Sequence, residues 1–149
     1  MKKILFFLII TVFIMQVHSQ GDPFSEIITA HINKTISMLG GAIPEGFQRL
    51  DRTMFRNNED IILMVENGIV TMSSFGDIFT TTGEAHLFTG LLFEHFENNR
   101  NNWVHFRSNR NGTEIYQKAD VYAGILKPAK RDDGMIVSVI SFSKNNSIF

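Results

Sequence analysis

The stretch DIILMVENGIVTMSSFGDIF, residues 60–79, predicts a β-hairpin at the centre of the fold. Its two arms, Ile61–Glu66 and Ile69–Ser73, are rich in apolar residues that favour strands. Asn67 and Gly68 separate the arms, and this dipeptide is the preferred two-residue turn because both of its positions need a positive φ. Since both arms are apolar on their two sides, we expect the strands to lie well inside a sheet or to be covered on both faces.

Two helices are expected on either side of this hairpin in the sequence. The first begins at Pro23, with Asp22 as its N-cap, and ends before Gly40; its apolar residues recur at helical spacing. The second spans roughly Gly83–Asn98, with one of the three preceding threonines as its cap. The segment 42–60 is ambiguous, because its apolar residues fit a short helix while its proline, glycine and paired asparagines fit a loop.

Four further strands are expected after the second helix. They correspond to the segments NWVHFRS, TEIYQK, DVYAGILK and MIVSVISFS, which are separated by polar turns. The last segment is apolar on both faces in its middle, so we expect it near the centre of the sheet. Together the elements predict an α+β two-layer sandwich, with about two main helices packed on a largely antiparallel sheet of about six strands.

The first 19 residues have the pattern of a secretory signal. Lys2 and Lys3 precede an apolar run of 12 residues, and Val17 and Ser19 suit the small positions before a signal-peptidase cut. The run is too short to cross a bilayer as a helix. We therefore expect cleavage after Ser19, no stable membrane anchor afterwards, and a single periplasmic or secreted domain over residues 20–149.

The composition excludes several classes of function. The chain has no cysteine, which removes thiol catalysis, thiolate metal sites and disulfides. Without Lys2 and Lys3 the chain keeps 12 of its 14 basic residues against 15 acidic ones, a net charge of −3, so we expect no nucleic-acid partner. Export without disulfides suggests a protein of a bacterial envelope. No cofactor motif is present, so we expect no cofactor.

The histidines are the main candidates for chemistry. His95 falls on the apolar stripe of the second helix, so it should be at least partly buried and need hydrogen-bond partners. It is either a general base in a pocket between helix and sheet, or a core histidine with a structural bond. His31, which flanks the stripe of the first helix, is the lesser candidate. The histidine spacing fits no metal site, so we expect no metal.

The aromatic residues of the predicted strands are a second set of candidates. Trp103, Tyr116 and Tyr122 either line a binding groove or belong to a Phe-rich core. Since no nucleophile motif is present, the sequence favours a non-enzymatic binding or interaction module of the bacterial envelope, with an unknown small ligand or an envelope protein as partner. Two alternatives stay open: a small hydrolase or lyase that uses His95 with a partner from the sheet, and a structural, self-associating subunit.

Overall fold

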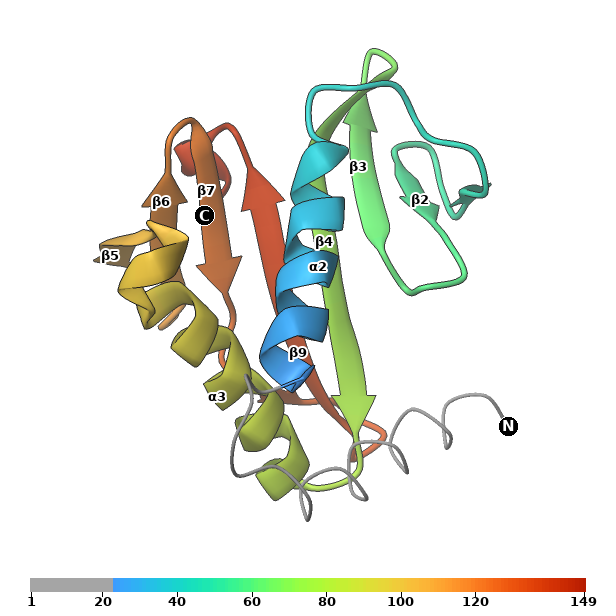
Figure 1. Ribbon diagram of the computed structural model, residues 1–149. Coiled ribbons are helices and arrows are strands. Elements are labelled where there is room, and N and C mark those ends of the chain that lie inside the picture. Colours follow the sequence, from blue (N-terminus) through green and yellow to red (C-terminus); the bar gives the residue numbers. More distant parts are fainter. Residues whose placement is uncertain (1–22) are drawn as a thin grey trace.

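The computed structural model describes residues 23–149. The expected signal sequence, residues 1–19, and the expected helix cap Asp22 lie outside the described residues. The described chain forms two α-helices and one nine-stranded sheet (Figure 1). The helices are α2 (Pro23–Ser37) and α3 (Thr82–Glu97), and the 3₁₀ turns are η1 (Asn99–Asn101) and η2 (Asn146–Ile148).

The strands pair in the order β1-β2-β3-β4-β9-β7-β6-β5, and β8 pairs with β9 beside this path. Every pair is antiparallel. In chain order the strands are β1 (Gln48–Arg49), β2 (Met54–Arg56), β3 (Ile62–Glu66), β4 (Ile69–Phe79), β5 (Val104–Ser108), β6 (Glu114–Lys118), β7 (Val121–Ile125), β8 (Ala129–Lys130) and β9 (Ile136–Ser143). The expected α+β class and antiparallel sheet are confirmed, but the expected number of about six strands was too small.

The three additional strands, β1, β2 and β8, are only two or three residues long. The ambiguous segment before the hairpin forms β1 and β2 and no helix. Its turn is fixed by the carboxylate of Asp51, which accepts hydrogen bonds from the backbone N–H groups of Thr53 and Met54, both at 2.8 Å. Such a local side-chain acceptor offers the backbone an alternative to helical hydrogen bonds.

The predicted hairpin is confirmed as β3 and β4. Asn67 and Gly68 have φ values of 52° and 80°, as a two-residue turn of this kind requires. β4 continues to Phe79, beyond the expected end of the second arm at Ser73. The expected central strand is confirmed as β9, which lies between β4 and β7.

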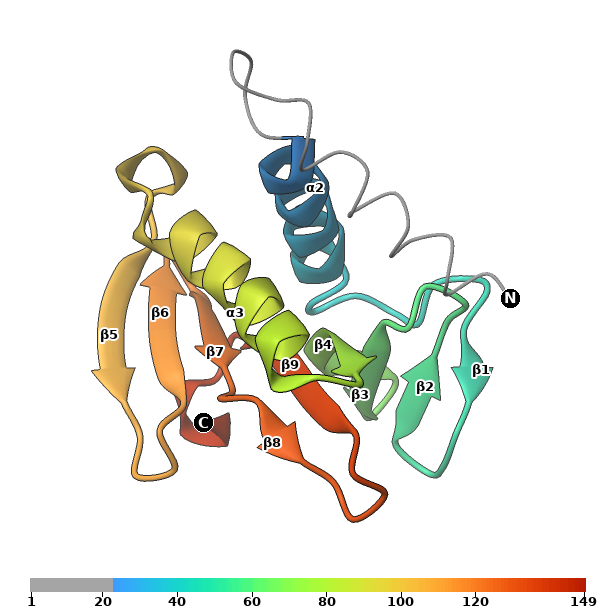
Figure 2. The same ribbon diagram turned by 90° about the horizontal axis from the view of Figure 1, so that it is seen from below.

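Both helices pack on one face of the sheet (Figures 1 and 2). On α2, the backbone carbonyl of Thr35 accepts a hydrogen bond of 3.0 Å from Ser73 Oγ of β4. On α3, Thr89 Oγ1 lies 2.9 Å from Ser138 Oγ of β9, and both side chains are buried. Thr81 caps α3 through a capping box with Glu84, which identifies the capping threonine among the three in the sequence. The core between helices and sheet includes Ile32, Leu63, Phe75, Leu92, Phe96 and Phe142.

The C-terminal segment packs on the opposite face of the sheet, over β6 and β7 (Figure 2). The ring of Phe149 lies directly on Gly124 of β7, so close that a Cβ at that position would be 2.5 Å from the ring. Asn109 Nδ2 donates to the Phe149 carbonyl at 2.9 Å, and the guanidinium of Arg107 donates to the Asn146 carbonyl at 3.2 Å. These contacts hold the C-terminal residues against this half of the face.

Candidate functional site

His95 is buried between α3 and α2, with 6 % of its surface exposed. Its Nδ1 lies 3.0 Å from Thr29 Oγ1 and 3.2 Å from Asn101 Nδ2. The same Asn101 amide donates to the backbone carbonyl of His95 at 2.7 Å, so the atom facing Nδ1 is a donor. Nδ1 therefore accepts, which selects the neutral tautomer with its proton on Nε2. Burial first, and the charge of Lys118 second, lower the pKa of His95.

This environment orients the His95 ring without giving it an acidic partner. Its partners come from α2 and from η1 after α3, and neither comes from the sheet. Among the residues that the structure describes, no carboxylate is hydrogen-bonded to the ring. A histidine that acts as a general base gains basicity and orientation from such a group. The geometry thus supplies a fixed, neutral imidazole held by a hydroxyl and an amide.

His31 is partly buried on α2 and lies edge-on against Phe75, with ring centroids 4.6 Å apart. Burial is the main cause that lowers the pKa of His31; Glu59 opposes this effect and Lys34 adds to it. Within residues 23–149 the side chain makes no hydrogen bond.

The three aromatic candidates lie on two different faces of the sheet. Trp103 and Tyr116 are buried on the helix side, with ring centroids 4.7 and 5.1 Å from Phe96. Tyr122 is partly buried on the opposite face, against Phe106. The three therefore do not line one groove. Burial, and the nearby carboxylate of Glu97, raise the pKa of Tyr116 to about 12, and its hydroxyl donates to Glu97 at 3.4 Å.

A polar cluster on β5 and β6 joins His105, Ser108 and Glu114. Glu114 Oε2 accepts from Ser108 Oγ at 2.6 Å and from His105 Nε2 at 2.8 Å. The hydrogen bond from Ser108, followed by that from His105, lowers the pKa of the Glu114 carboxyl. Because serine and histidine both donate to the carboxylate, the histidine does not activate the serine as a nucleophile. No group of three potential ligands in the described part of the chain could hold a metal ion.

One half of the sheet face opposite the helices carries neither helix nor C-terminal segment among the described residues. We call this surface the open face. The register brings three methionines side by side across β2, β3 and β4, since Met54 pairs with Met64 and Met64 with Met72. At its centre Ser74 and Ser141 hydrogen-bond to each other at 2.9 Å. The apolar side chains of the open face are Met54, Ile62, Met64, Met72, Ile78, Val137 and Val139.

The open-face side chains of β4 and β9, and Ile62 and Met64 of β3, are uncharged, whereas Arg56 of β2 and Glu66 of β3 lie on the same side at the edge of this surface. Its methionines and valines are partly buried by one another, and Ile78 is 43 % exposed. Sequence reasoning missed this surface because it depends on which strands pair and in which register. The apolar character of both sides of the hairpin arms was the available signal, and it was equally compatible with a covered sheet.

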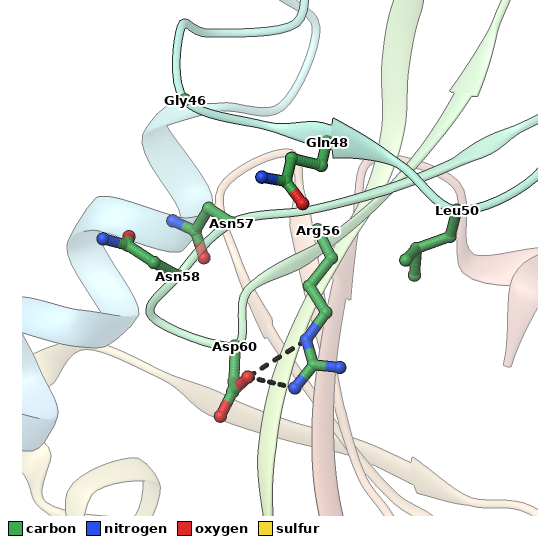
Figure 3. A pocket seen from close by; sticks show the side chains of 7 residues that line it. All are labelled: Gly46, Gln48, Leu50, Arg56, Asn57, Asn58 and Asp60. Carbon is green, nitrogen blue, oxygen red and sulfur yellow. Dashed lines mark hydrogen bonds and ion pairs between the residues drawn. The ribbon is translucent and has the colours of Figure 1, made fainter. Parts of the chain in front are cut away.

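A depression of about 520 Å³ lies beside β1 and β2 (Figure 3). It is bordered by Gln48, Leu50 and Arg56 from the hairpin of β1 and β2, and by Asn58 and Asp60 from the loop before β3. The guanidinium of Arg56 is hydrogen-bonded to the carboxylate of Asp60, through Nε at 3.0 Å and through Nη2. The only sign of this depression in the sequence is a cluster of polar residues in the segment 42–60, whose secondary structure was ambiguous.

No family model matches the chain, and it matches neither a curated protein nor a solved structure in the comparisons made. Within residues 23–149, neither α-helix combines the length and apolar character needed to cross a membrane.

Proposed function

We propose that the chain is a non-enzymatic interaction module, exported to a bacterial envelope, that binds a partner protein through the open face. The signal-like residues 1–19 and the absence of cysteine support export to such a compartment. The single observation that carries the binding role is the open face itself, a continuous and mostly apolar surface over β2, β3, β4 and β9 whose charged side chains, Arg56 and Glu66, lie at its edge.

The chemistry of the open face favours a protein partner. Contiguous apolar surface on a monomer marks interaction sites more often than chance, since leaving it in water is unfavourable. Methionine has an unbranched, polarisable side chain that adapts to irregular surfaces. The row Met54, Met64 and Met72 therefore suits a contact that repacks around the partner.

The chain's own C-terminal segment indicates what kind of surface the partner presents. On the neighbouring half of the same sheet face, this segment places the ring of Phe149 against Gly124. The open face begins at the next strand of the sheet and is likewise apolar at its centre. We therefore commit to an envelope protein with an uncharged, apolar contact surface as the occupant.

The setting of His95 supports this role over that of a hydrolase or lyase. Its Nδ1 is bonded to Thr29 and Asn101, and its pKa is lowered. Among the described residues no carboxylate is hydrogen-bonded to the ring, and the one hydroxyl that is, that of Thr29, comes from α2 and not from the sheet. A core histidine that ties α3 to α2 accounts for these contacts.

The test compares two exposed aliphatic residues that are changed to lysine. Ile78 lies on the open face and is 43 % exposed, whereas Leu87 lies on α3 and is 52 % exposed. We expect wild type and Leu87→Lys to crosslink to one discrete envelope protein through a photoreactive residue at position 72. We expect Ile78→Lys to lose the crosslink while its far-UV circular dichroism and melting temperature stay unchanged. Purified partner should then bind wild type but not Ile78→Lys.

Equal crosslinking by both lysine variants would contradict a role for the open face. If sedimentation shows that wild type self-associates and Ile78→Lys does not, the alternative of a structural, self-associating subunit replaces the proposal.

A further inference from the structure

We infer that the depression beside β1 and β2 is a separate binding site for a neutral sugar unit. The inference does not depend on the protein partner proposed for the open face. Its volume of about 520 Å³ falls within the range of small-molecule sites. Figure 3 shows the side chains of Gln48, Asn57 and Asn58 on one side of it, with Arg56 and Asp60 opposite.

The charges at this site offset each other. Arg56 is paired with Asp60 inside the depression, and the adjacent Glu59 is paired with Lys34 of α2, with Nζ–Oε distances of 2.7 and 2.6 Å. An anionic ligand would meet the carboxylate of Asp60, and a cationic ligand the guanidinium of Arg56. The pair therefore favours a ligand without net charge.

Two amide side chains at the site are available to a ligand. Neither Gln48 nor Asn58 uses its side-chain amide in a hydrogen bond to another described residue. Each amide offers two donors and one acceptor oxygen. Asn57, by contrast, uses Oδ1 to accept from the backbone N–H groups of Glu59 and Ile61, at 3.1 and 2.9 Å, and so holds the loop in shape.

This set of groups matches the hydroxyl groups of a carbohydrate. A sugar hydroxyl both donates and accepts, and the amides of Gln48 and Asn58 supply the complementary atoms on one side of the depression. Leu50, which is 53 % exposed, provides an apolar contact for the C–H face of the ring. An apolar drug-like molecule would find only this one aliphatic side chain, which argues for a polyhydroxylated ligand.

The site lies on the same side of the sheet as the open face. Gln48 pairs with Arg56, Arg56 with Ile62, and Ile62 with Ser74, so these side chains form one row across four strands. A sugar bound in the depression would sit at the rim of the open face. A partner that carries a glycan, or a wall polysaccharide beside it, could then be contacted from the same side.

The experiment titrates ¹⁵N-labelled protein with chitotriose, cellotriose and maltotriose and follows the backbone amide signals of residues 46–60. Probe concentrations of about 10 mM suit the ~1 mM dissociation constant expected of a shallow polar site. We expect at least one trisaccharide to shift these signals. The double variant Gln48→Ala/Asn58→Ala should weaken binding about tenfold, because two hydrogen bonds are lost. Asn33→Ala, an exposed amide on α2, is the matched control and should bind as wild type does.

Three outcomes would overturn the inference: no shift with any of the trisaccharides, shifts with inorganic phosphate but not with the sugars, or unchanged affinity in the double variant. Ile78→Lys should bind the sugar normally, so loss of the protein partner and loss of the sugar site can be told apart.

Discussion

Two histidines at the interface between helices and sheet make folding sensitive to acid. Burial lowers the pKa of His95 and His31 below the ordinary value of 6.5. Below that pH the unfolded chain takes up protons that the folded state resists, so stability is fully present above pH ~6.5 and is lost as the pH falls toward the folded-state values. We predict that the free energy of unfolding, measured with urea, decreases between about pH 7 and pH 5.

Carboxylates also take up protons in acid, so substitution is needed to show how much of the loss of stability comes from the two histidines. In a His31→Gln/His95→Gln double variant, the decrease between these two pH values should be smaller than in wild type, even if the variant is less stable at pH ~7. An identical decrease in both proteins would mean that the histidines do not cause the acid sensitivity.

At the scale of the elements, one buried hydrogen bond joins α3 to the central strand of the sheet. Thr89 Oγ1 and Ser138 Oγ lie 2.9 Å apart, and Thr89 also donates to the Ala85 carbonyl at 2.8 Å. Thr89→Val leaves the buried Ser138 hydroxyl without this partner and should destabilise the protein by about 1–3 kcal/mol. Adding Ser138→Ala should recover part of the loss, because both partners are then apolar.

A double-mutant cycle by chemical denaturation measures this coupling. If the loss of unfolding free energy in the double variant equals the sum of the losses in the two single variants, the hydroxyl pair does not tie α3 to β9.

The elements that the sequence predicted are those with a strong local signal. The Asn67–Gly68 turn and the apolar period of α3 are encoded within a few residues, and both elements formed where expected. β8 has no such signal, because Ala129 and Lys130 become a strand only through pairing with β9. The same distinction holds at His95: helical periodicity predicted its burial, whereas its partners Thr29 and Asn101 depend on how α2 and η1 pack against α3.

At the scale of the whole molecule, two glycines differ in what a methyl group would meet. A Cβ on Gly76 of β4 would lie 2.3 Å from the Ser138 carbonyl oxygen, inside the central ladder. A Cβ on Gly124 would meet the Phe149 ring, which belongs to a terminal side chain that can move. We predict that Gly76→Ala destabilises the protein by about 3 kcal/mol and Gly124→Ala by about 1 kcal/mol.

The same pair of variants reports on the C-terminal segment. Gly124→Ala should displace Phe149 and speed its removal by carboxypeptidase under native conditions. A smaller loss of stability in Gly76→Ala than in Gly124→Ala would contradict the close contacts assigned to the two glycines. Displacement would extend the open face onto β7.

The pairing of β4 with β9 has a kinetic consequence. Residues 48–79 and residues 104–143 each form antiparallel strands with near neighbours in the chain, and the β4–β9 ladder alone joins these two groups within the sheet. Local hairpins close in microseconds, whereas bringing Phe75 to Ile140 requires the intervening chain, with α3, to close as one loop. We therefore expect the formation of the β4–β9 junction to be the slow step of folding; until it forms, the molecule consists of two half-sheets with unpaired central edges.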